Sequence, residues 1–169
     1  MTKFFIELNR RFEVYQAVDT PENLAQHSYM RALLGQEGGK TWDELLCHRL
    51  VVVLGEPGSG KTEELKAQQV RQSSNSFFLE LNRLVKEEMD VILDDDANLR
   101  FAQWKKGGGE ATFFLDAVDE SKIERNEDFY TALDRVKKAV GSALARSKFV
   151  ISSRISEWRP ETDREGVLQ

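Results

Sequence analysis

The fold of this chain is decided by the stretch Leu50-Val51-Val52-Val53-Leu54-Gly55-Glu56-Pro57-Gly58-Ser59-Gly60-Lys61-Thr62. Its first five residues are apolar and rich in β-branched side chains, which predicts a buried strand. The next eight match the pattern Gly-x-x-x-x-Gly-Lys-Ser/Thr in full. This pattern, between a strand and a helical stretch, is typical of a loop that binds the phosphates of a nucleotide.

The chemistry of phosphate binding explains the residue types in this loop. Glycines at its first and sixth positions let the backbone curl so that N–H groups point inward and surround phosphate oxygens. Lys61 can reach the β- and γ-phosphates, and the Thr62 hydroxyl can bind Mg²⁺. A helix expected to begin near Gly60 adds the positive end of its dipole. The predicted nucleotide-binding residues are Gly55, Glu56, Pro57, Gly58, Ser59, Gly60, Lys61 and Thr62.

Short apolar strands alternate with helical segments through the rest of the chain. The segment Asn126–Ser147 has the clearest amphipathic pattern, with apolar residues every three or four positions. Such alternation indicates a parallel sheet covered on both faces. We therefore expect an α/β fold, a three-layer α/β/α sandwich with a mainly parallel sheet. Its expected strands are Leu50–Leu54, Phe77–Glu80, Ala111–Leu115 and Lys148–Ser152, and further helices are expected over Lys61–Gln72 and Leu99–Lys106.

The third expected strand is followed by a carboxylate, Asp116, and then by two more, Asp119 and Glu120. The carboxyl ends of parallel strands meet where ligands bind, so we expect Asp116 to lie near a metal held by Thr62. Glu120, or Asp119 as the weaker candidate, would orient a water molecule for attack on the γ-phosphate. The alternative is that Asp119 and Glu120 only cap the segment that follows.

The fourth expected strand is followed by Arg154. A guanidinium at that strand end can reach the γ-phosphate and report its presence. Ser152 or Ser153 could hydrogen-bond the attacking water or a phosphate oxygen. The alternative for Arg154 is an exposed side chain in a loop.

Three segments together resemble the phosphate loop, acidic strand and sensor strand of NACHT-type ATPases. They are GEPGSGKT at 55–62, FFLDAVDE at 113–120 and VISSR at 150–154. These ATPases belong to the STAND class of P-loop signalling NTPases, which includes bacterial anti-phage sensors and animal innate-immune receptors. The resemblance extends from about Trp42 to Pro160.

The resemblance assigns a role to each matching residue. It implies that Lys61 and Thr62 bind phosphate and Mg²⁺ and that Asp116 holds the metal. It further implies that Glu120 is the acid that orients water and that Arg154 senses the γ-phosphate.

The chain departs from this family after the sensor strand. Family members continue into a helical lid and a repeat domain, whereas this sequence ends fifteen residues beyond Arg154. It also shows no convincing fifth strand. We expect a piece of a larger protein, truncated after the sensor strand, with a reduced relative as the alternative. The expected organisation is an N-terminal helical or linker segment at 1–40, an NTPase core at 41–160 and a connector to the lid at 161–169.

Composition narrows the class of protein. An apolar fraction of 40% with 31% charged residues is typical of a globular domain with a real core. The net charge of −5 and the absence of a Lys/Arg cluster do not indicate nucleic-acid binding. A single cysteine, Cys47, suits a reducing cytoplasm. No long apolar run predicts a signal peptide or a membrane span.

The leading functional hypothesis is an ATP·Mg²⁺-binding switch domain with weak ATPase activity, acting in signalling or anti-phage defence. Its expected partner is a nucleoside triphosphate, with self-assembly of the full-length protein. GTP is disfavoured because no Asn-Lys-x-Asp motif follows the acidic strand. Two alternatives remain open: a small nucleotide or metabolite kinase, and a scaffold that binds ATP without hydrolysing it.

Overall fold

A computed structural model describes residues 10–14, 39–72, 74–117 and 126–154 of the chain. The chain divides into two compact units, Met1–His48 and Arg49–Gln169. The first includes the whole predicted N-terminal segment at 1–40, of which residues 1–9 and 15–38 lie outside the described part. The predicted connector at 161–169 also lies outside it.

The described part of the first unit contains one short helix, α2 (Trp42–Leu45). The Thr41 side chain accepts a hydrogen bond from the Glu44 N–H, and the Glu44 carboxylate accepts one from the Thr41 N–H at 2.7 Å. This reciprocal cap is the one that the Thr41–Glu44 spacing predicts. The bond from the Thr41 backbone holds the pKa of Glu44 below its ordinary value. An antiparallel bridge between Phe12 and Lys40 shows that Phe12 is extended rather than helical.

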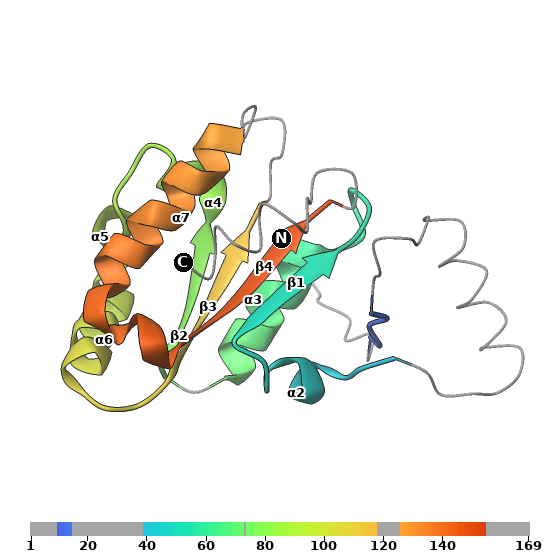
Figure 1. Cartoon of the computed structure of the whole chain (residues 1–169), viewed down its shortest axis with the longest axis horizontal. Coiled ribbons are helices and arrows are strands. Elements are labelled where there is room, and N and C mark those ends of the chain that lie inside the picture. Colours follow the sequence, from blue (N-terminus) through green and yellow to red (C-terminus); the bar gives the residue numbers. More distant parts are fainter. Residues whose placement is uncertain (1–9, 15–38, 73, 118–125, 155–169) are drawn as a thin grey trace, which may run out of the picture. The chain divides into compact units, whose positions relative to one another are not determined.

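The second unit is built on a four-stranded sheet in which every pair of neighbouring strands is parallel. This confirms the predicted α/β class and the parallel sheet. The strand order is β1-β4-β3-β2, so the last strand lies between the first and the third. All four arrows point to one edge in Figure 1, where the carboxyl ends of the strands meet. The strands are β1 (Leu50–Leu54), β2 (Ser76–Glu80), β3 (Ala111–Asp116) and β4 (Ser147–Ser153).

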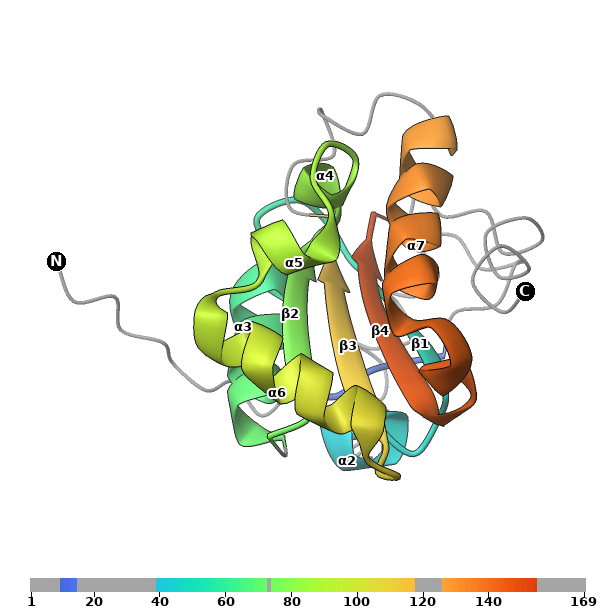
Figure 2. The same cartoon turned by 90° about the vertical axis from the view of Figure 1, so that its left-hand side faces the viewer.

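Helices lie on both faces of this sheet (Figures 1 and 2). Helix α3 (Lys61–Arg71) joins β1 to the far edge strand β2 and covers one face. The remaining helices pack on the opposite face, as a parallel α/β sheet requires. They are α4 (Leu81–Leu84), α5 (Met89–Ile92), α6 (Asp95–Lys106), α7 (Asn126–Val140) and the 3₁₀ helix η2 (Gly141–Arg146).

Two predicted helices have different bounds in the structure. Helix α6 begins at Asp95 rather than Leu99, because the Asp94 carboxylate accepts a hydrogen bond from the Ala97 N–H at 2.7 Å and caps it. The helix expected over Asn126–Ser147 is α-helical only to Val140. Gly141 has a φ of 58°, and the chain tightens there into η2.

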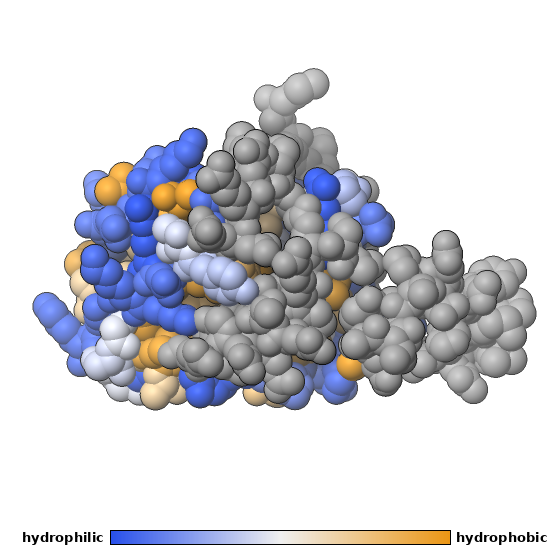
Figure 3. Space-filling model, turned by 45° about the horizontal axis from the view of Figure 1, so that its top comes forward, coloured by the Kyte–Doolittle hydropathy of each residue, from blue (hydrophilic) through white to orange (hydrophobic). Residues whose placement is uncertain are grey.

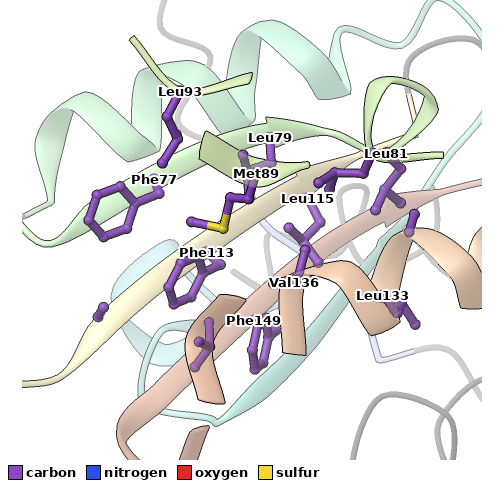
Figure 4. Packing of buried hydrophobic residues seen from close by; sticks show 14 of the residues in the cluster. Phe77, Leu79, Leu81, Met89, Leu93, Phe113, Leu115, Leu133, Val136 and Phe149 are labelled. Atoms are coloured by element: carbon purple, nitrogen blue, oxygen red, sulfur yellow. The ribbon is translucent and has the colours of Figure 1, made fainter. Parts of the chain in front are cut away.

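The main core lies between the sheet and helices α4 to α7 (Figure 4). Phe77, Phe113 and Phe149 occupy matched positions on three adjacent strands. Their rings stack at centroid distances of 5.3 and 5.5 Å. Leu133 and Val136 of α7 complete the layer, which confirms the apolar face predicted for that helix. This packing fixes the sheet that carries the candidate site.

The described surface is polar on the face shown in Figure 3, where hydrophobic residues form only small separate patches. Across the described ranges, none of the helices has the length and apolar character needed to traverse a lipid bilayer.

Replacing Phe113 by alanine tests the role of this aromatic row. Phe113 is fully buried between the other two phenylalanines, so Phe113→Ala should lower the free energy of unfolding by about 3–5 kcal/mol. Urea denaturation followed by circular dichroism measures the loss. The control is Leu99→Ala, because Leu99 is 58% exposed and should change stability by less than about 0.5 kcal/mol. Equal losses in the two variants would contradict the packing described.

Candidate functional site

Two glycines in the loop between β1 and α3 have a left-handed backbone. Gly58 and Gly60 have φ values of 73° and 83°, in the left-handed region that side-chain-bearing residues rarely adopt. Gly60 is the N-cap of α3, and its carbonyl accepts the Glu64 N–H at 3.1 Å. The loop therefore turns directly into an eleven-residue helix, whose N-terminal end favours bound anions.

Lys61 lies back over this loop. Its Nζ donates hydrogen bonds to the carbonyls of Gly55 at 2.8 Å and Glu56 at 2.9 Å. The positive charge is thus held at the loop rather than extended into solvent. Thr62, the next residue, is half-buried in the first turn of α3. Lys61 and Thr62 are thus the first two residues of α3, directly after the loop.

Asp116 is the last residue of β3 and is only 1% exposed. One carboxylate oxygen, Oδ1, accepts a short hydrogen bond from the Ser152 hydroxyl. The other, Oδ2, is buried and has no hydrogen-bond partner among the described residues. A buried carboxylate oxygen without a partner is costly. It is also the kind of hard oxygen ligand that Mg²⁺ prefers, so the donor fits that ion.

The alternation of side chains along the strands decides on which face Asp116 lies. Phe113 and Leu115 belong to the core on the α7 side, so Asp116 must point to the face covered by α3. Phe78 on β2 supports this division, because its ring lies 5.1 Å from the Nζ of Lys66 in α3. Asp116 and the start of α3 therefore share one face and one edge of the sheet.

Arg154 directly follows β4 and is half-buried. Because β4 lies between β1 and β3, Arg154 follows a strand that is flanked by the strand before the glycine loop and by the strand that ends in Asp116. The Gly55 N–H donates to the Ser153 carbonyl at 3.2 Å, which ties the start of the loop to the residue before Arg154. The structure thus brings three separate predicted segments to one edge.

Two predicted catalytic residues, Asp119 and Glu120, lie outside the described residues. A carboxylate that the sequence analysis missed is Glu80, which ends β2 directly opposite Asp116 in the strand register. It is half-buried and, by alternation, points to the α3 face. Its signal in the sequence is an apolar strand that ends in an acidic residue, the same signal that identified Asp116.

Histidine, cysteine and carboxylate side chains do not gather in groups of three or more suited to a metal ion in the described ranges. A nucleotide-linked Mg²⁺ does not need such a group, because it keeps several waters and takes further ligands from phosphates.

The sequence matches no protein-family model, and no curated protein matches it either. The functional inference therefore depends on the geometry of this edge of the sheet.

A pair of glycine variants tests the left-handed backbone of the loop. A Cβ at either Gly58 or Gly108 would meet no atom within 4 Å, but only Gly58 has a positive φ. We expect Gly58→Ala to cost about 1 kcal/mol of stability, and Gly108→Ala to be neutral or slightly stabilising. Thermal and urea denaturation measure both changes. If Gly58→Ala is as stable as Gly108→Ala, the left-handed conformation at Gly58 is incorrect.

Proposed function

We propose that this chain carries a nucleotide switch domain of the P-loop NTPase type, similar to the NACHT ATPases of the STAND class, that binds ATP with Mg²⁺ and hydrolyses it slowly. The observation that carries the proposal is the unpartnered Oδ2 of Asp116 on the face and edge of the sheet where the phosphate-type loop and α3 begin. The motif supplies groups for phosphate, and Asp116 supplies an oxygen suited to the accompanying metal.

In this proposal each group acts by position and charge. Backbone N–H groups of residues 55–62 and the N-terminus of α3 bind the phosphate oxygens. Lys61 exchanges its bonds to the Gly55 and Glu56 carbonyls for bonds to the β- and γ-phosphates. Thr62 Oγ1 and Asp116 Oδ2 would hold Mg²⁺, which when bound neutralises charge on the transferred phosphoryl group.

The remaining roles follow the resemblance. Glu120, or Asp119, orients the attacking water, and Arg154 contacts the γ-phosphate from its place between the loop and Asp116. Hydrolysis should be slow, because a lid or a neighbouring subunit usually completes the charge stabilisation in phosphoryl transfer. In the full-length protein the nucleotide state would control self-assembly in the cytoplasm, in signalling or antiviral defence.

Calorimetric titration with ATP tests the binding function. We expect binding that is tighter with Mg²⁺ than with EDTA and tighter for ATP than for GTP. Lys61→Ala should weaken ATP binding by at least about tenfold, since hydrogen bonds to charged groups contribute roughly 1.5–3 kcal/mol. Lys66→Ala is the matched control, because Lys66 lies in the same helix and faces the Phe78 ring instead of the loop. Undiminished binding by Lys61→Ala, or none by the unaltered protein, would refute the proposal.

Measuring phosphate release tests the catalytic role of Glu120. Glu120→Gln should retain ATP binding and lower the hydrolysis rate by about 10²–10⁴-fold, the range that a positioned base supplies. The control is Glu110→Gln, at the other end of β3, where Glu110 pairs with Lys148 at 2.9 Å. Equal background rates in all three proteins would show that this chain binds ATP without hydrolysing it. Transfer of phosphate to a nucleoside monophosphate would instead identify a kinase.

A further inference from the structure

We propose that Ser152 is a positioning residue that makes Asp116 a one-oxygen metal ligand. Its hydroxyl occupies Oδ1, which leaves Oδ2 as the atom directed at Mg²⁺ or at a water bound to it. This inference rests on the proposed nucleotide function and adds to it a residue that acts through Asp116 and does not itself touch the nucleotide.

The hydrogen bonds of Ser152 leave its hydroxyl no freedom to turn elsewhere. The Oγ donates its single proton to Asp116 Oδ1 and accepts the Ala117 N–H at 3.1 Å. Ser152 is only 1% exposed. With its proton committed in this way, the hydroxyl cannot also donate to a phosphate oxygen, one of the two roles expected for it from the sequence.

The neighbouring Ser153 does not replace Ser152 in this role. It follows Ser152 along β4, so its side chain points to the opposite face of the sheet. Its hydroxyl donates to the Arg154 carbonyl at 3.3 Å. Of the two serines, Ser152 is therefore the one that lies on the same face of the sheet as Asp116 and hydrogen-bonds to it.

Both partners stand on strands rather than on loops. Leu115 pairs with Ile151 in the register of β3 and β4, so Asp116 and Ser152 are the next residues on the same two strands. Side chains held by regular elements are positioned more accurately than those on loops. The carboxylate plane is thus fixed before any metal binds, as is typical of groups that orient metal ligands.

A serine also suits this place electrostatically. It satisfies one oxygen of Asp116 with a neutral donor and places no cation beside the carboxylate. No described lysine or arginine forms an ion pair with Asp116. A cationic partner at this position would compete with the metal for the carboxylate.

The test compares ATP affinity with Mg²⁺ and with EDTA, measured by calorimetry, in Ser152→Ala and in the unaltered protein. Loss of such a supporting hydrogen bond typically lowers metal affinity by about 10–100-fold. The gain is the ratio of the ATP affinity with Mg²⁺ to the ATP affinity with EDTA. We expect this gain to be about tenfold or more smaller in Ser152→Ala, with unchanged ATP affinity in EDTA. Ser152→Thr keeps the hydroxyl and should keep the gain. Electron paramagnetic resonance can measure the affinity of each variant for Mn²⁺ in the presence of ATP. These Mn²⁺ affinities should rank the variants in the same order, and the measurement does not depend on catalysis.

Ser147→Ala is the matched control. Ser147 is equally buried on the same strand and donates to the Ala143 carbonyl at 3.0 Å, but it lies at the opposite end. Its loss should lower stability without changing the Mg²⁺-dependent gain. Ser152→Cys keeps the side-chain volume with only a weak donor, so it replaces the alanine variant if that variant does not fold.

A double-variant cycle separates positioning from a general structural effect. Because Ser152 acts through Asp116, adding Ser152→Ala to Asp116→Asn should cause no further loss of the gain. Any of three results would overturn the inference. Ser152→Ala could keep the full increase in ATP affinity that Mg²⁺ gives, or Ser147→Ala could lose as much of that increase as Ser152→Ala. In the third, the losses of the two single variants would add in the double variant. If the unaltered protein does not bind ATP at all, the proposed function fails as well, and that result is distinct from the others.

Discussion

The burial of one carboxylate is the constraint on which the rest of the site depends. Asp116 is almost completely enclosed, yet a single serine hydroxyl is its only hydrogen-bond donor among the described residues. A charge held in this way costs stability unless a cation or further donors compensate it. That cost falls at the carboxyl edge of the sheet, on the face where α3 begins. A metal ion that bridges this carboxylate and bound phosphates would relieve it.

The order of the strands makes this arrangement possible. Insertion of β4 between β1 and β3 sets Ser152 beside Asp116 and brings Arg154 out beside the loop. The stacked phenylalanines on the other face of the sheet tie β2, β3 and β4 together, so the carboxyl ends of these strands are held by a packed core.

Local patterns in the sequence predicted much of this fold. Several predicted features depend on residues close together in the chain, and they occur in the structure. They are the four apolar strands, the glycine loop, the Thr41–Glu44 cap and the amphipathic face of α7. The strand order could not be derived in the same way, because it is set by contacts between distant segments. For that reason the Ser152–Asp116 pair and the position of Glu80 opposite Asp116 were not predicted.

The central claim is that the loop and Asp116 meet around one nucleotide–metal pair. A crystal structure of the protein with Mg²⁺ and a non-hydrolysable ATP analogue tests it most directly. The account predicts phosphates within residues 55–62, and a metal bound by Thr62 Oγ1 at about 2.0–2.1 Å, the usual Mg²⁺–oxygen distance. Asp116 Oδ2 should contact that metal directly or through one of its waters. A nucleotide bound elsewhere, or a metal that leaves Asp116 Oδ2 without contact, would contradict the account.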